Sequence, residues 1–162
     1  MRNLLVVLAL TLGLSAFSQA VELQYDFENL GGLNPWYNDD CGLELGFANP
    51  FPEGINTSAS VMRYADNGGL YANVGLDVGK SLNLNTNSVF TMKIYVPSNS
   101  LVGTQNHQVS LKLQNGLLDQ PWTTQSEIIK PIVLDQWQEL TFDFSSDPFF
   151  NFSAGSGHPM NR

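Results

Sequence analysis

The sequence is poor in three kinds of residue on which many functions depend. It contains one cysteine, two histidines, and seven lysines and arginines in 162 residues. A single cysteine excludes an internal disulfide, so packing or a bound ion must stabilise the fold. We interpret Cys41 as a small buried hydrophobic residue rather than a reactive thiol. The formal net charge of −8 suits a soluble or calcium-binding protein and disfavours nucleic acid and anionic lipid, which require basic patches.

The sequence also lacks a catalytic signature. It has no Gly-rich phosphate loop, zinc spacing or nucleotide motif. Neither His107 nor His158 has an orienting partner nearby in the sequence, as a triad or a lyase would require. Glu139 and Asp143 would lie roughly 13 Å apart on one strand at about 3.3 Å per residue. This separation exceeds the roughly 5 to 9 Å of paired glycosidase carboxylates, so catalysis is the less favoured alternative.

Residues 1–20 have the features of a secretory signal peptide. Arg2 precedes an apolar run from Leu4 to Leu14, and small residues stand before an expected cleavage site at Val21. The run of about 11 residues is too short for a membrane span, which needs roughly 20. We therefore predict a secreted mature chain, residues 21–162, that forms one domain and does not insert into a membrane.

Short runs of alternating apolar and polar residues, broken by Gly, Asn, Asp, Ser and Pro, dominate the rest of the chain. This pattern is typical of an all-β sandwich or barrel. In the clearest run, residues 108–115, Val109, Leu111 and Leu113 are expected to face the core while Lys112 and Gln114 face solvent. Further strands are expected at residues 23–28, 43–47, 58–64, 70–76, 89–96, 124–133 and 137–144.

Several details of the arrangement can be predicted as well. Residues 29–40 are expected to form a loop that carries Trp36 and Tyr37. The turn residues 66–69 are expected to join their two flanking strands in a hairpin. Residues 89–96 are apolar at almost every position, which predicts a strand near the middle of a sheet.

Four segments together resemble one protein family. They are Asp26-Phe27-Glu28 followed by Gly32 and Trp36, the run Phe90 to Pro97, the run Leu111 to Asn115, and the run Trp137 to Ser145. These strand patterns are similar to those of the jelly-roll carbohydrate-binding modules appended to secreted bacterial polysaccharide-degrading enzymes.

The resemblance implies a two-sheet antiparallel jelly-roll β-sandwich with a glycan site on a concave face or at the loop tips. It also implies a structural calcium ion near the first strand, with Glu28 as a ligand. The family pattern ends in a further strand that carries an Asp, and this sequence stops before any such strand. We therefore expect an incomplete sandwich that was once part of a larger glycan-degrading protein.

Sugar binding requires an aromatic surface and a few polar groups that contact hydroxyls. Trp122, preceded by Pro121, is the best candidate for the aromatic surface, and a core residue under the loop is its alternative. Trp137 is interpreted as structural. The family resemblance favours a buried Trp36. The candidate ligand-binding residues, which could equally belong to a solvated face, are Trp122, Lys112, Gln114, Tyr37, Trp36, Gln125 and Arg63.

The sequence thus predicts a secreted, non-catalytic module that binds a polysaccharide or oligosaccharide. One or two stacked rings and a few hydrogen bonds predict weak binding, with Kd roughly micromolar to millimolar. Two alternatives remain open. The first is a catalytic jelly-roll glycoside hydrolase or polysaccharide lyase, and the second is a structural or adhesive β-sandwich of the cell surface.

Overall fold

The computed structural model describes residues 23–28, 36–101, 103–104, 106–148 and 150–151. The predicted signal peptide, Gly32 and His158 lie outside these ranges. Strands and two short 3-10 turns make up the regular structure of the described residues. They are β1 Trp36–Asp39, β2 Cys41–Ala48, β3 Ser60–Asp66, β4 Asn73–Leu76, β5 Val89–Ile94, η1 Ser98–Ser100, β6 Gln108–Gln114, η2 Pro121–Thr123, β7 Gln125–Pro131, β8 Gln138–Asp143 and β9 Phe150–Asn151.

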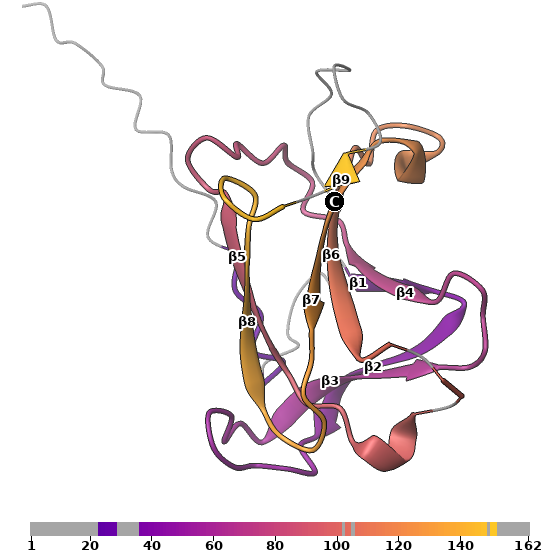
Figure 1. Ribbon diagram of the computed structural model, residues 1–162, viewed down its shortest axis with the longest axis vertical. Coiled ribbons are helices and arrows are strands. Elements are labelled where there is room, and N and C mark those ends of the chain that lie inside the picture. The colour runs from indigo at the N-terminus through magenta and orange to yellow at the C-terminus, as the bar shows by residue number, and fades with distance from the viewer. Residues whose placement is uncertain (1–22, 29–35, 102, 105, 149, 152–162) are drawn as a thin grey trace, which may run out of the picture.

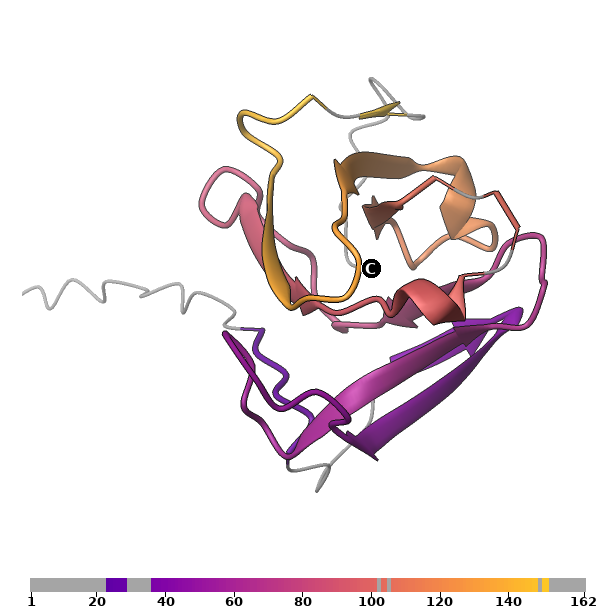
Figure 2. The same cartoon turned by 60° about the horizontal axis from the view of Figure 1, so that its bottom comes forward.

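The protein is all-β, and its strands form small antiparallel sheets. The pairs are β1 with β4, β2 with β3, and β5 with β8, while β6, β7 and β9 form a three-stranded sheet. In Figure 1, β7 stands between β6 and β8. Figure 2 shows the β2–β3 pair as a layer of its own beneath the β5–β8 and β6–β7 pairs. Among the described residues, no helix has the length and apolar character needed to cross a membrane.

The hydrophobic core lies between the β5–β8 pair and the β6–β7 pair. Its buried members are Leu113, Ile128, Phe142 and Phe144. Phe142 and Ile128 are almost completely buried, which contributes about 1.5 to 3 kcal/mol for each side chain. The partly buried residues packed around them are Leu82, Leu84, Phe90, Met92, Val109, Leu111 and Leu140.

The core confirms the predicted facing of two strands. Leu113 of β6 is buried while Lys112 beside it is exposed. On β8, Phe142 is buried while Glu139 and Thr141 are exposed. Alternation therefore identified the inward face correctly on both strands, because successive residues of a strand project to opposite faces.

The expected strand at residues 23–28 does not form. Phe27 has φ of 60°, the left-handed region, which interrupts an extended chain. Tyr25 is 42% exposed and contacts Trp36 edge-on, with 5.5 Å between ring centroids. The Phe27 ring also packs against Trp36, at 5.7 Å. The aromatic residues of this segment thus contact β1 through their side chains rather than through a strand ladder.

Two further predictions about the N-terminal half were wrong. Trp36 and Tyr37 belong to strand β1 rather than to a loop. The predicted turn at residues 66–69 forms, with Gly68 at φ of 87° and its N–H donating to Asp66 Oδ1 at 2.8 Å. The turn does not make a hairpin, however, because β3 pairs with β2 and β4 pairs with β1. Turn chemistry fixed the chain reversal but not the partner of the next strand.

Strand β5 also differs from its prediction. In the described part of the chain it pairs with β8 alone and so does not lie in the middle of a sheet. Phe90 and Met92 are apolar because they pack against the core on one face of the strand. Val89 is apolar but 54% exposed, so the strand is not buried on both faces.

Cys41 is buried, as predicted, at the start of β2. Its thiol donates to the backbone oxygen of Asn73 at 3.2 Å. Burial raises the pKa of the Cys41 thiol above its ordinary value. The protonated, buried form fits a packing role rather than a nucleophilic one.

Candidate functional site

The β6–β7 hairpin carries two polar pairs on the face opposite the core. Its register places Gln114 opposite Gln125 and Lys112 opposite Glu127. Residues directly opposite each other in an antiparallel pair project to the same face. Gln114 Nε2 donates to Gln125 Oε1 at 2.9 Å, and Lys112 Nζ lies 3.8 Å from Glu127 Oε1. We call these four residues the polar strip.

The structure thus brings three of the predicted site residues together and adds Glu127. The Lys112 side chain is 44% exposed, whereas that of Glu127 is 15% exposed. Glu127 was not among the predicted residues. The signal that could have found it is the β6–β7 register, which places an acid opposite the lysine.

Trp122 lies on the connection between the two strands of the polar strip. The residue is 61% exposed, so it is a surface residue and not a core residue under the loop. The preceding Pro121 is buried and anchors the turn η2. The N–H groups of Thr123 and Thr124 donate to the carbonyl oxygens of Gln120 and Pro121, each at 3.1 Å. The turn therefore fixes the backbone around Trp122, which stands shortly before Gln125 in the sequence.

Arg63 belongs to a different surface, on the β2–β3 pair. Its Nη2 lies 2.6 Å from Glu44 Oε2, and its guanidinium carbon lies 4.3 Å from the centroid of the Phe47 ring. Both charged side chains are about half exposed, so the ion pair stabilises the fold weakly. The sequence grouped Arg63 with Lys112 among the candidate ligand-binding residues. The structure places the two residues on separate sheets.

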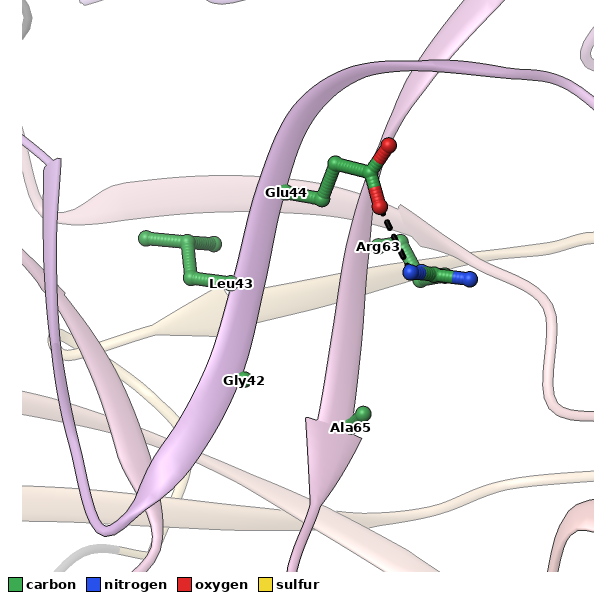
Figure 3. Close-up of a pocket in the computed structure, with 5 residues that line it drawn as sticks. All are labelled: Gly42, Leu43, Glu44, Arg63 and Ala65. Carbon is green, nitrogen blue, oxygen red and sulfur yellow. Dashed lines mark hydrogen bonds and ion pairs between the residues drawn. The ribbon is translucent and has the colours of Figure 1, made fainter.

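A small pocket of about 140 Å³ lies beside this ion pair. Figure 3 shows Glu44 and Arg63 directed toward each other while Leu43 points the other way. Gly42 and Ala65 are paired across the two strands and have small or no side chains. The residues that line the pocket are Gly42, Leu43, Glu44, Arg63 and Ala65.

Trp36 and Tyr37 lie on the β1–β4 sheet, which is also separate from the polar strip. Trp36 is half-buried against Tyr25 and Phe27, in agreement with a packing role. The Tyr37 ring covers Gly75, where an added Cβ would overlap the ring. Tyr37 is 36% exposed, so part of its ring stays accessible to solvent.

Glu28, the predicted calcium ligand, contacts backbone donors. Its Oε1 accepts from the N–H of Ala59 at 2.5 Å and from that of Ser60 at 3.3 Å. The Glu28 N–H in turn donates to Asp26 Oδ1 at 3.0 Å. Within the described ranges, no group of three or more His, Cys, Asp or Glu side chains could hold a metal ion. Calcium binding at Glu28 stays a prediction.

Asp143, an acid weighed for catalysis, is a structural hydrogen-bond acceptor. Its carboxylate accepts from Ser145 Oγ at 2.6 Å, Ser146 Oγ at 2.7 Å and Ser88 Oγ at 3.2 Å. These bonds, chiefly those from the side chain and backbone of Ser145, lower the pKa of Asp143 to about 2. A general acid near neutral pH needs a raised pKa, so Asp143 is unsuited to that role.

Comparison with protein-family models, with curated proteins and with solved structures finds no match to this chain. The chemistry of the polar strip and of Trp122 is therefore the basis on which a function is inferred.

Proposed function

We propose that the protein is a secreted, non-catalytic module that binds a polysaccharide through Trp122 and the polar strip. The observation that carries the proposal is the exposed indole of Trp122 on the connection between the two strands that pair Gln114 with Gln125. We further propose that the small antiparallel sheets belong to a jelly-roll β-sandwich. The family resemblance of the sequence supports this finer assignment.

The exposed indole supplies the apolar part of a sugar site. Indole rings combine a large apolar face with a polar edge, and a pyranose presents a face of C–H groups that can lie on such a ring. A stacked ring adds about 0.5 to 1.5 kcal/mol beyond the area that it buries. Trp122 is suited to this contact because it is 61% exposed while the buried Pro121 fixes the backbone before it.

The polar strip supplies donors and acceptors for hydroxyl groups. The Gln114–Gln125 bond uses one amide nitrogen and one amide oxygen. Of the other amide atoms, Gln114 Oε1 is a further acceptor and Gln125 Nε2 carries two N–H donors. A sugar hydroxyl can both donate and accept, so adjacent hydroxyls match this arrangement. With about 1 kcal/mol net for each hydrogen bond, the expected Kd is roughly micromolar to millimolar.

Affinity gel electrophoresis with soluble glucans, xylans and alginates tests the binding function. We expect at least one polymer to retard the protein, and Trp122→Ala to weaken retardation at least about fivefold with an unchanged melting temperature, since the ring is exposed. Tyr71→Ala is the matched control, because Tyr71 is 73% exposed but lies between β3 and β4. Its retardation should equal that of the wild type. Absence of retardation with every polymer would overturn the proposal.

Secretion has a separate test. Expression of the full chain followed by N-terminal sequencing should show cleavage before Val21, as expected of a signal peptide. Retention of residues 1–20 on the exported or cell-associated protein would contradict this part of the proposal and leave the binding test unaffected.

A further inference from the structure

The positive charge of the polar strip is already compensated. Lys112 Nζ lies 3.8 Å from Glu127 Oε1, and the Glu127 side chain is only 15% exposed. A side chain that is mostly covered has little freedom to move away when a ligand approaches. An anionic ligand that reaches Lys112 must therefore approach the Glu127 carboxylate as well, and the two like charges repel each other.

Three other cations of the described surface are also engaged. Arg63 pairs with Glu44 at 2.6 Å, and Lys130 pairs with Asp147 at 2.7 Å. Lys93 Nζ donates to the backbone oxygen of Ile55 at 3.0 Å. The whole chain has a formal net charge of −8. A polymer with a carboxylate on each sugar meets a repulsive field, which acts over about 8 Å at physiological ionic strength.

We infer that the site accepts an uncharged polysaccharide and discriminates against carboxylated ones, an inference that rests on the proposed binding function of Trp122 and the polar strip. A neutral hydroxyl can donate to Glu127 while it accepts from Lys112, so the intact ion pair offers the hydroxyl both an acceptor and a donor. A sugar carboxylate has no proton to donate near neutral pH and would face Glu127 as a second anion. The ion pair thus selects for hydroxyl groups rather than for charge.

Polymers that share a backbone and differ chiefly in charge provide the direct test. Hydroxyethyl cellulose is compared with carboxymethyl cellulose, and methyl-esterified polygalacturonate with polygalacturonate, by affinity gel electrophoresis. In each pair that binds, we expect the uncharged polymer to bind at least about fivefold more tightly, equivalent to about 1 kcal/mol. Its binding should change less than about twofold between about 0.05 and 0.5 M NaCl, because no charge pair forms with the ligand.

Glu127→Gln tests the ion pair itself. This variant releases Lys112, and we expect binding of the carboxylated polymers to strengthen about threefold, the scale of an exposed charge pair, and to fall again at high salt. Glu139→Gln is the matched control. It removes the same charge from an exposed position on β8, opposite Lys93, and should leave the preference unchanged.

Glu127 is mostly covered, so its variant is compared with the wild type by thermal unfolding. If Glu127→Gln fails to fold, Lys112→Gln tests the ion pair through its more exposed residue. It leaves the Glu127 carboxylate uncompensated, so we expect binding of the carboxylated polymers to weaken further while binding of the uncharged polymers changes less. Unchanged or tighter binding of the carboxylated polymers in this variant would contradict the inference.

The outcomes separate the two proposals. Tighter, salt-sensitive binding of the carboxylated polymers by the wild-type protein would overturn the inference and leave the binding function intact. Absence of retardation with both charged and uncharged polymers, and with the wider panel, would overturn the binding function and the inference with it.

Discussion

The indole N–H of Trp137 donates a hydrogen bond of 2.7 Å to the backbone oxygen of Phe51, across 86 positions of the sequence. The Tyr95 ring contacts both residues. It stacks on Phe51 with 4.0 Å between centroids and meets Trp137 at 5.7 Å. Phe51 lies in the connection between β2 and β3, while Trp137 precedes β8. This cluster therefore connects the β2–β3 pair to the strands that enclose the core, and it confirms the structural interpretation of Trp137.

Replacing Trp137 should destabilise the protein without affecting polysaccharide binding. Trp137→Phe keeps an aromatic ring but loses the hydrogen bond, which should cost about 1 kcal/mol. Trp137→Ala also loses the packing with Tyr95 and should cost about 3 kcal/mol. Denaturant unfolding measures both changes. A Trp137→Phe protein as stable as the wild type would show that the bond to Phe51 contributes nothing.

Glu28 should stabilise the protein whether or not calcium is present. Its carboxylate accepts from the N–H groups of Ala59 and Ser60, and Glu28→Ala removes that acceptor at a cost of about 1 kcal/mol. Melting temperatures in calcium and in EDTA check this. Glu28→Gln is the control, since its amide oxygen can still accept but its charge is lost. A cost of Glu28→Ala that appears only in calcium would instead identify Glu28 as primarily an ion ligand.

Gly75→Ala should disturb the β1–β4 pair. A methyl group at this position overlaps the Tyr37 ring, so the ring must move, at a cost of about 1 to 3 kcal/mol. Gly42→Ala is the control, because its Cβ would meet Ala65 Cβ at an ordinary 3.5 Å. In a double-mutant cycle, Gly75→Ala should cost less in a Tyr37→Ala background. Equal costs in both backgrounds would show that the overlap is relieved in another way.

The lowered pKa of Asp143 predicts that the protein loses stability in acid. Its pKa of about 2 in the folded protein lies below its ordinary value of 3.8, so between these values the folded state binds fewer protons than the unfolded state. The stabilisation is therefore complete above about pH 4 and is lost as the pH falls through about 2. The pKa values of Asp147 and Asp135 are also lowered, chiefly by backbone hydrogen bonds, and act in the same direction.

Denaturant midpoints measured from about pH 6 to about pH 2 test this dependence. We expect Asp143→Asn to lower the midpoint at neutral pH and to flatten its decline in acid. Asp119→Asn, at an exposed position in the β6–β7 connection, is the control of equal charge. If the Asp143→Asn midpoint declined as steeply as that of the wild type, the acid dependence would have to come from other carboxylates.

Strands with a clear inward face could be predicted from the sequence. β6 and β8 follow their alternation because Leu113 and Phe142 are each buried in a shared core. The same alternation was misleading at residues 23–28, where Phe27 has a positive φ. Tyr25 and Phe27 pack on Trp36 through their rings, although their segment pairs with no described strand. Alternation records which residues can share a face, but a strand also requires a partner.

The pairing of strands was the part that the sequence did not specify. β4 pairs with β1, whose residues Trp36–Asp39 follow a segment rich in Gly and Asn and carry no alternating pattern. For the candidate site, the sequence pointed to Lys112, Gln114 and Gln125, which the β6–β7 register brings together, and to Trp122, which is exposed. The sequence could not place Glu127 opposite Lys112 or Arg63 on a separate sheet, because both placements depend on which strand lies opposite which.

The turn η2 affects the entropy cost and the rate of polysaccharide binding. Besides its backbone bonds, the hydroxyl groups of Thr123 and Thr124 donate to the oxygens of Gln120 and Pro121 at 2.7 and 3.2 Å. The backbone beneath Trp122 is thus set before any ligand arrives, so association would sacrifice little chain entropy there. In the proposed function, weak binding through Trp122 on this fixed turn would let the protein dissociate and rebind rapidly at equivalent positions along one polysaccharide chain.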